Sequence, residues 1–259
     1  MVVLRVGQAL REGWEAFRRA PVPFVAFSLL VALLQLPINV LQDSVTVARN
    51  QGAAPSALLL SLLLSLLALL VNLWGIAGLV RGAWIALEGG RPRLSTLLHW
   101  DGAALRRLLL ATLLLALLVL LLLDLFRPLL QPILTALEES ATSGLPPTLP
   151  VTPLGALVLA AGASLGLYLA VNQSFLGQIA LLEGPGPWRT LQRGRAVVDP
   201  QWLQVLLLHL LQALLILIGV LACLVGVFVA LPVVTCMSTA AWRQLAGTAD
   251  PKGFARVPG

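Results

Sequence analysis

The feature that most limits the fold of this chain is a run of 41 residues without a formal charge, from Trp202 to Trp242. A membrane helix needs about 20 apolar residues to cross the hydrocarbon core, so this run is too long for one crossing and long enough for two. Inside lipid, a crossing segment must satisfy its own backbone hydrogen bonds, which favours helices. We therefore predict a helical hairpin with a tight turn around Gly219 to Gly226, and a kink at Pro232 in its second helix.

Four further apolar runs predict four further membrane helices. With 59% hydrophobic and 11% charged residues, the 259-residue chain has too few polar residues for a soluble protein of its size. The expected fold is all-α, a polytopic membrane protein with six transmembrane helices in a single integral membrane domain, residues 1–259. Thr152 followed by Pro153 is a typical helix start for the fourth span. The first four spans are expected at about Val22–Leu41, Ser56–Val80, Leu108–Leu123 and Leu154–Leu176.

The segments that follow several of these runs indicate an internal repeat. The motif WIALEG (Trp84 to Gly89) is echoed by IALLEG (Ile179 to Gly184) and by WRQLAG (Trp242 to Gly247), each time after a long apolar run. A glycine after the last helical turn is a common left-handed C-terminal cap, so helix-ending chemistry alone also explains the shared glycine. The domain divides into three helix-hairpin repeat units and a tail expected to be loosely ordered: about 1–90, 91–184 and 185–247, then 248–259.

Each repeat unit is expected to contain an amphipathic helix at the membrane interface. Between residues 3 and 19, apolar side chains recur every three or four positions, and charged side chains occupy the other faces. The apolar positions are Val3, Val6, Leu10, Trp14 and Phe17. This pattern predicts a helix that lies on the membrane surface. The loop 124–153 is expected to form a short amphipathic helix only in its first half, because its second half is rich in proline.

The distribution of positive charge predicts how the chain is oriented. All but two of the 17 Lys and Arg residues fall in the N-terminal segment, in the hinges around 82–107 and 183–199, and in the tail. The two exceptions, Arg49 and Arg127, lie in the opposite loops. Cytoplasmic loops carry the excess of positive charge in membrane proteins. We therefore expect a multi-pass protein of the bacterial inner (plasma) membrane or an internal membrane, with both termini cytoplasmic and no nucleic-acid partner.

The sequence carries no motif of a familiar catalytic class. It lacks HExxH, GxSxG, a P-loop and a cysteine cluster. Its two cysteines, Cys223 and Cys236, are expected to be reduced and packed. His99 and Asp101 are two neighbouring metal-ligand types without a third. We therefore expect a protein that is not an enzyme, with no catalytic residue, no metal site and no cofactor.

Polar residues inside the expected spans are the best candidates for a functional site, because polar groups in lipid face protein or water. His209 and Gln212 are three residues apart and so share one helix face. These side chains either bridge helices by hydrogen bonds or line a cavity for a ligand or a proton path. No Asp, Glu, Lys or Arg lies inside an expected span. The candidate intramembrane polar cluster is Asn72, Asn172, Gln173, His209 and Gln212.

Small residues predict where helices pack closely. Gly162 and Gly166 form a GxxxG pattern in the fourth span, and a neighbouring helix is expected against them. Ala222, Gly226 and Ala230 are expected to give the sixth span a second small-residue face. Both faces are typical of contacts between membrane helices, within one chain or between two.

Three segments carry a resemblance to a known group of proteins. They are GAWIALEGGRPRL, the stretch IALLEGPGPWRTLQRGRAVVDPQWLQVLLL, and the final Ala241-Trp242-Arg243-Gln244-Leu245. With the pattern of an interfacial helix before paired Leu-rich spans, the chain resembles poorly characterised six-helix bacterial membrane proteins grouped with the membrane domain of glycerophosphodiester phosphodiesterases. The resemblance covers most of the chain and implies six helices. It implies no activity, because no catalytic domain accompanies the membrane helices here.

Two classes of function fit these observations. The absence of catalytic motifs and the small-residue faces favour a non-enzymatic membrane scaffold or assembly factor. Its partners would be the lipid bilayer and another membrane protein. The internal repeat and the proline in the sixth span favour the alternative, a transporter or permease for a small molecule or lipid.

Overall fold

The computed structural model describes residues 3–51, 56–143, 152–222 and 226–255, and every regular element in these ranges is helical, as predicted. In chain order the elements are α1 (Val6–Arg19), α2 (Pro21–Asn50), α3 (Ser56–Leu87), α4 (Leu94–Leu98), α5 (Gly102–Ser143), α6 (Pro153–Asn172), α7 (Leu176–Gln178), a π-helical turn (Ile179–Glu183), α8 (Pro187–Val198), a 3-10 turn (Asp199–Gln201), α9 (Trp202–Leu221) and α10 (Val227–Ala246).

Five helical segments in the described ranges are long and apolar enough to cross a membrane, as in a multi-pass membrane protein. The helix α10, which the sequence predicts as the sixth crossing, is not among them. Its second half carries Thr239, Arg243 and Gln244, and much of that half is buried against α1 and α3. Six crossings therefore stay a prediction. The five segments are Pro21–Asn50, Ser56–Leu87, Gly102–Pro128, Pro153–Asn172 and Pro187–Leu221.

The first hairpin is longer than the apolar runs predict. Residues 42–50, expected in a loop, continue α2 as helix. The amide Nε2 of Gln42 donates to the hydroxyls of both Ser61 and Ser65 at 3.1 Å, so polar side chains join α2 to α3 here. At the other end, α3 runs past the expected limit at Val80 as far as Leu87. The extension of α2 is thus supported by polar contacts with α3, and the extension of α3 by contacts of Arg81 and Ala86 with other segments.

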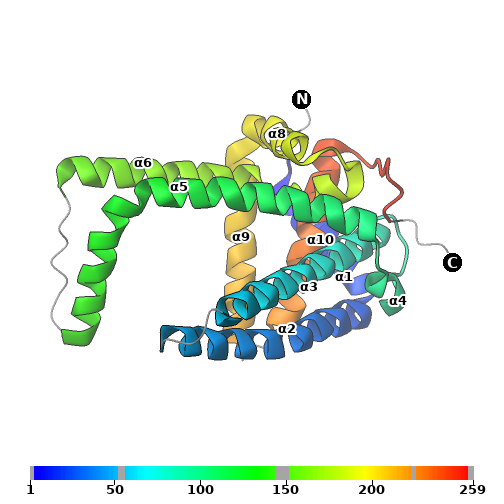
Figure 1. Cartoon of the computed structure of the whole chain (residues 1–259). Coiled ribbons are helices and arrows are strands. Elements are labelled where there is room, and N and C mark those ends of the chain that lie inside the picture. Colours follow the sequence, from blue (N-terminus) through cyan, green and yellow to red (C-terminus); the bar gives the residue numbers. More distant parts are fainter. Residues whose placement is uncertain (1–2, 52–55, 144–151, 223–225, 256–259) are drawn as a thin grey trace.

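The helix α5 is also longer than predicted. Its 42 residues would span about 63 Å at 1.5 Å per residue, twice the hydrocarbon core of a bilayer. Pro128 and Pro132 lie inside it, and Figure 1 shows its last part turning away from the line of its first part. A proline removes one helical hydrogen bond and clashes with the preceding turn, which explains the bend. The short helix expected after residue 127 is therefore the end of α5.

Three antiparallel hairpins meet at one end of the molecule (Figure 1). We call the hairpins α2–α3, α5–α6 and α9–α10 the arms. The region where they meet is the base, made of α1, α4, α8, the π-helical turn, and the C-terminal ends of α3 and α10. In Figure 1, α5 and α6 extend together beyond α9, which runs across their direction. The two termini of the described chain both belong to the base.

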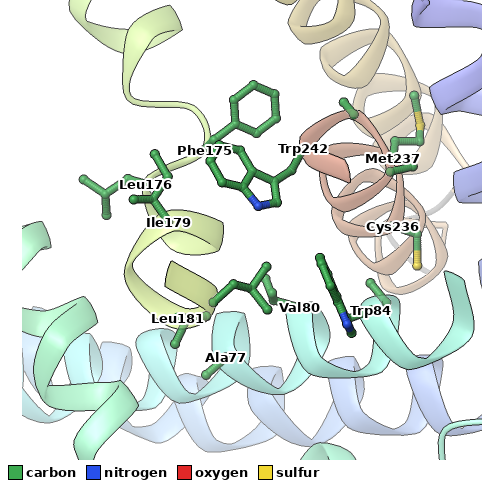
Figure 2. Packing of buried hydrophobic residues seen from close by; sticks show 14 of the residues in the cluster. Ala77, Val80, Trp84, Phe175, Leu176, Ile179, Leu181, Cys236, Met237 and Trp242 are labelled. Carbon is green, nitrogen blue, oxygen red and sulfur yellow. The ribbon is translucent and has the colours of Figure 1, made fainter. Parts of the chain in front are cut away.

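The hydrophobic core lies in the base. Trp84 of α3 and Trp242 of α10 are each 1% exposed, and the rings of Phe175 and Trp242 lie 5.8 Å apart between centroids. Figure 2 shows these rings packed with Ile179 and Leu181 of the π-helical turn. The arms, in contrast, present many exposed leucines along α2, α3, α5, α6 and α9. Such surfaces suit lipid rather than water.

The glycines that close the three echoed motifs share one backbone feature. Gly89, Gly184 and Gly247 have φ angles of 94°, 60° and 88°, in the region that disfavours residues with a Cβ. Each amide N–H bonds back to a carbonyl of the helix it ends, such as Gly184 to Ile179 at 2.9 Å. Gly184, with ψ of 40°, is the left-handed cap that was predicted, whereas Gly247, with ψ of −170°, is not. The division into repeat units stays a prediction.

The helix α1 packs on α10 through its small residues. Ala9, Gly13 and Ala16 are buried, and a Cβ on Gly13 would lie 2.6 Å from the backbone nitrogen of Met237. Of the predicted apolar stripe, Phe17 is buried while Trp14 remains exposed. The amphipathic helix therefore covers α10 with one face and leaves another free for the interface. The small side chains on the buried face of α1 explain how its backbone comes so close to that of α10.

Candidate functional site

A buried arginine ties three parts of the base together. Arg81 of α3 is 1% exposed and comes directly after Val80, the last residue expected in that span. Its Nε donates to the carbonyl of Phe254 at 3.0 Å, and its Nη1 donates to the carbonyl of His99 at 2.8 Å. The guanidinium also lies over the Phe254 ring, 4.2 Å from its centroid. A buried cation is costly unless it is paired or hydrogen-bonded, so these bonds hold the tail and the α4–α5 connection against α3.

The C-terminal tail is docked rather than loosely ordered over its described residues. The carboxylate of Asp250 accepts from the backbone N–H groups of Phe254 at 3.0 Å and Ala255 at 2.9 Å. Phe254 is buried and covers Arg81. The prediction of a loose tail was wrong for residues 250–255, because a short polar segment gives no sign of a remote arginine that holds it.

Two other arginines secure the π-helical turn. Arg107 of α5 donates to the carbonyls of Ala180 at 3.3 Å and Leu181 at 3.5 Å. Arg193 of α8 makes a forked ion pair with Glu183, with its closest contacts at 3.1 Å. The turn's backbone carbonyls and its terminal carboxylate are therefore both satisfied from neighbouring helices. Glu88, at the equivalent position of the first echoed motif, instead accepts from the Trp84 indole at 2.9 Å.

Two members of the candidate polar cluster join α6 to α8. Asn172 donates from Nδ2 to Asp199 at 2.9 Å, and the same carboxylate oxygen accepts from Tyr168 at 2.8 Å. Gln173 donates from Nε2 to the carbonyl of Leu191 at 3.2 Å. A 3-10 turn separates Asp199 from the start of α9, and its carboxylate accepts from side chains of α6.

The other three members lie apart from these two. Asn72 is exposed on α3. His209 has its Nδ1 at 3.0 Å from the carbonyl of Val205 in its own helix. Gln212 is buried and donates to the hydroxyl of Ser238 at 2.9 Å, which bridges α9 and α10. The structure therefore does not gather the five residues into one cluster.

The GxxxG face of α6 lies against a groove. Gly162 faces the ring of Phe126 on α5, where a Cβ would meet a ring carbon at 2.6 Å. Gly166 faces nothing, since its Cβ position has no heavy atom within 4 Å. Between α5 and α6 lies an apolar groove of about 620 Å³, which we call the α5–α6 groove, with Gln173 at its base end. Close packing is thus present at Gly162 and absent at Gly166.

The second small-residue set lies at the tip of the α9–α10 arm. A Cβ on Gly226 would lie 2.7 Å from the carbonyl oxygen of Gly219, so the two helices approach closely there. Ala230 is buried in α10, whereas Ala222 is exposed and belongs to the turn after α9. The helix α9 ends at Leu221 and α10 begins at Val227, on either side of the turn predicted around Gly219 to Gly226, whose residues 223–225 lie outside the described ones. An apolar groove of about 660 Å³ lies between this arm and α1.

Of the two neighbouring metal-ligand types, Asp101 contributes its carboxylate to the fold, whereas His99 contributes its backbone carbonyl and its side chain is exposed. The carboxylate of Asp101 accepts from the backbone of Ala104 at 2.9 Å at the start of α5, and the carbonyl of His99 accepts from Arg81. Within the described ranges, no three His, Cys, Asp or Glu side chains come together as metal ligands. Cys236 is buried and unpaired, while Cys223 lies outside the described residues.

Sequence analysis could not single out Arg81 or the open position at Gly166. Arg81 reads as an ordinary hinge charge, because it follows the apolar run directly. The GxxxG pattern does mark α6, but it does not say which glycine is covered. Compared with known proteins, the chain matches no family model, no curated protein and no solved structure.

Proposed function

We propose that the chain is a non-enzymatic integral membrane scaffold or assembly factor that seats a transmembrane helix of another membrane protein in the α5–α6 groove. The observation that carries this proposal is the unfilled face at Gly166. Small residues there leave room for a backbone, and no side chain of the described residues uses that room.

The character of the groove favours a helix as its occupant. In lipid, helices associate through close packing, and small residues let two backbones approach. Gly166 and Ala170 lie one turn apart on α6, and both line the groove. The wall on α5 consists of larger apolar side chains, including Val119 and Leu122. A helix of the partner protein can insert its side chains between them. The groove therefore offers a smooth wall and a ridged wall, as helix packing requires.

The charges of the base support the proposed topology of six crossings with both termini in the cytoplasm of a bacterial inner membrane. The basic residues of α1, α8, the hinges and the tail gather in the base, whereas Arg49 and Arg127 lie far along the arms. Reporter fusions test this orientation. Fusions after Gly90, Gly186 and Gly247 should report inside, and those after Gly52, Gly144 and Gly219 should report outside. A cytoplasmic signal after Gly144 would contradict it.

A transporter for a small molecule or lipid is the second candidate. The volume of the α5–α6 groove, about 620 Å³, falls within the usual range for small-molecule sites. Its lining, however, offers one polar side chain, Gln173, to orient a solute. The remaining polar candidates, including His209 and Gln212, make bonds within or between their own helices instead of continuing a path. Solute movement by the purified protein in liposomes would favour this candidate over the scaffold.

The direct test places a photoreactive residue in the groove of the protein in its native membrane. Leu169 lines the groove, whereas Leu167, two residues away, is exposed on another face of α6 and serves as the control. A crosslinker at Leu169 should yield one discrete protein adduct heavier than the chain. The same crosslinker at Leu167 should yield lipid adducts.

A filled groove provides the matched variant. Replacing Gly162 and Gly166 by Leu should abolish the adduct from Leu169 while the protein still inserts into the membrane. Lipid adducts alone at Leu169 would contradict the scaffold proposal. An adduct of twice the chain's mass would replace the separate partner by a second copy of this chain.

A further inference from the structure

A polar pocket of about 320 Å³ lies between α1, α3 and α10, on the base and apart from the α5–α6 groove. Arg19 and the two acids Glu12 and Glu15 line it from α1, and Arg243 and Gln244 line it from the end of α10. Residues of opposite charge thus meet in one small space. None of them takes part in the bonds that hold Arg81 or the π-helical turn.

Two side chains that line this pocket each carry a buried donor without an acceptor among the described residues. Gln244 uses its Oε1 to accept from the backbone N–H of Arg5 at 3.0 Å, and its Nε2 is buried without a partner. The Nη1 of Arg243 is likewise buried without a partner, while its guanidinium lies 5.1 Å from the centroid of the Trp84 ring. Buried donors of this kind are rare unless a water, an ion or a ligand supplies the acceptor.

The second arginine of the pocket, Arg19, is held in a fixed position. Arg19 donates from Nη1 to the carbonyl of Ala86, which holds its guanidinium beside the end of α3. A second, shallower pocket joins Arg19 to Arg18, Arg91 and Glu15. The arginines of both pockets create a positive field, and guanidinium groups are well suited to the oxygens of a phosphate.

The two acids give the pocket a negative side. Glu12 accepts from Gln8 at 2.7 Å through one carboxylate oxygen. Within the described ranges, neither Glu12 nor Glu15 forms an ion pair with an arginine. A ligand that bears only negative charge would be repelled by the carboxylates of Glu12 and Glu15. A ligand with a cationic group next to its phosphate would instead complement them.

The place of the pocket in the fold indicates where its ligand comes from. Pro21 begins α2 two residues after Arg19, and Leu87 ends α3 at the pocket wall. Both helices are long and apolar enough to cross a membrane, so the pocket lies level with their ends, at the depth of lipid headgroups. We propose that it binds a phosphate with a neighbouring ammonium group, as in a phosphoethanolamine lipid headgroup, with Arg19, Arg243 and Gln244 on the phosphate and the two acids on the ammonium.

The test measures lipid retention by the full-length protein in detergent, using native mass spectrometry. The probes are dioleoyl phosphatidylethanolamine, dioleoyl phosphatidylglycerol and free phosphoethanolamine. The ethanolamine lipid should be retained most strongly. R243Q and R19Q should each lower its affinity about tenfold or more, because each removes a charge-assisted contact to the phosphate. The matched control R189Q, an exposed arginine on α8, should leave it unchanged.

The variant E15Q tests the ammonium side and shifts the preference toward the glycerol lipid. Because Arg243 stacks on Trp84, the melting temperature of R243Q is measured alongside. If that variant does not fold, R19Q and E15Q decide the outcome. Equal retention of the two lipids by the unaltered protein would overturn the proposal, as would R19Q and R243Q that bind normally. Free phosphoethanolamine that binds as tightly as the lipid would make the ligand a soluble compound and overturn the headgroup assignment.

Discussion

The base and the arms of this protein are built from different residues and held by different forces. The base packs tryptophans, a buried arginine and capped helix ends, and its polar groups are bonded between segments far apart in the chain. The arms are Leu-rich helices whose side chains face outward. Within the arms, specific contacts between helices are fewer, such as Gln42 with Ser61 and Gln212 with Ser238. Most of the contacts that fix the fold therefore lie in the base, and most of the exposed apolar surface lies along the arms.

The largest difference is expected for equal truncations in the two regions. Leu181 is fully buried in the base, and Leu157 is 67% exposed on α6. Leu181→Ala should lower the free energy of unfolding by about 2–5 kcal/mol, because it leaves a cavity. Leu157→Ala should change it by less than about 0.5 kcal/mol. Reversible unfolding in SDS, followed by circular dichroism, compares the two. Equal losses would remove the distinction between base and arm.

Removing the buried arginine should break the base nearly as strongly. Arg81→Met keeps most of the side-chain volume but loses the bonds to the carbonyls of Phe254 and His99. Hydrogen bonds to charged groups contribute about 1.5–3 kcal/mol each, so the loss should be about 3 kcal/mol or more. The tail should also become sensitive to protease. Arg189→Met, at an exposed site, is the control, and a protected tail in Arg81→Met would contradict this role.

The contact between α1 and α10 should respond to a single methyl group. Gly13→Ala places a Cβ 2.6 Å from the Met237 backbone, and the resulting shift should cost about 1–3 kcal/mol. Gly7 lies on the same helix with nothing within 4 Å of its Cβ position, so Gly7→Ala should be neutral or stabilising by up to about 1 kcal/mol. Thermal unfolding of both variants in detergent checks the pair. Equal changes in stability for Gly13→Ala and Gly7→Ala would contradict the close packing of α1 on α10.

The smallest effect is expected for polar residues within the arms. Gln212→Leu removes the bond to Ser238 between α9 and α10, and should destabilise by about 0.6–2 kcal/mol. His209→Leu loses only a contact within its own helix, so its effect should be smaller. Reversible unfolding in SDS shows which of the two variants loses more free energy of unfolding. A stable His209→Leu protein that fails to complement a deletion strain would instead mark His209 as part of a functional path.

Some of this architecture could be predicted because it depends on neighbours in the sequence. The turn after Gly219 follows from the length of the uncharged run, and Thr152 caps α6 by accepting from Gly155 at 3.1 Å, as the Thr-Pro pair indicates. Positive φ at Gly89 and Gly184 follows from their place after a helical turn. Local backbone chemistry decides each of these features.

Other features depend on segments far apart in the chain and leave no local signal. Arg81 bonds to Phe254, 173 residues away, and a hinge arginine looks the same whether it is buried or solvated. The scattered placement of Asn72 and His209 depends on how the arms diverge, which hydropathy does not encode. For the same reason, the GxxxG pattern marks a packing face on α6 but does not show that Gly166 stays uncovered.

The most direct test of the central comparison is a pair of distance distributions from spin labels on the purified protein in lipid nanodiscs. One pair spans two arms, with labels at Leu60 of α3 and Leu157 of α6. The other lies on the base, at Arg11 and Arg189. All four sites are exposed, and the background carries Cys223→Ala, since Cys236 is buried. The account predicts a narrow distribution for the base and a broader one between the arms. An arm distribution as narrow as that of the base, without a partner present, would contradict it.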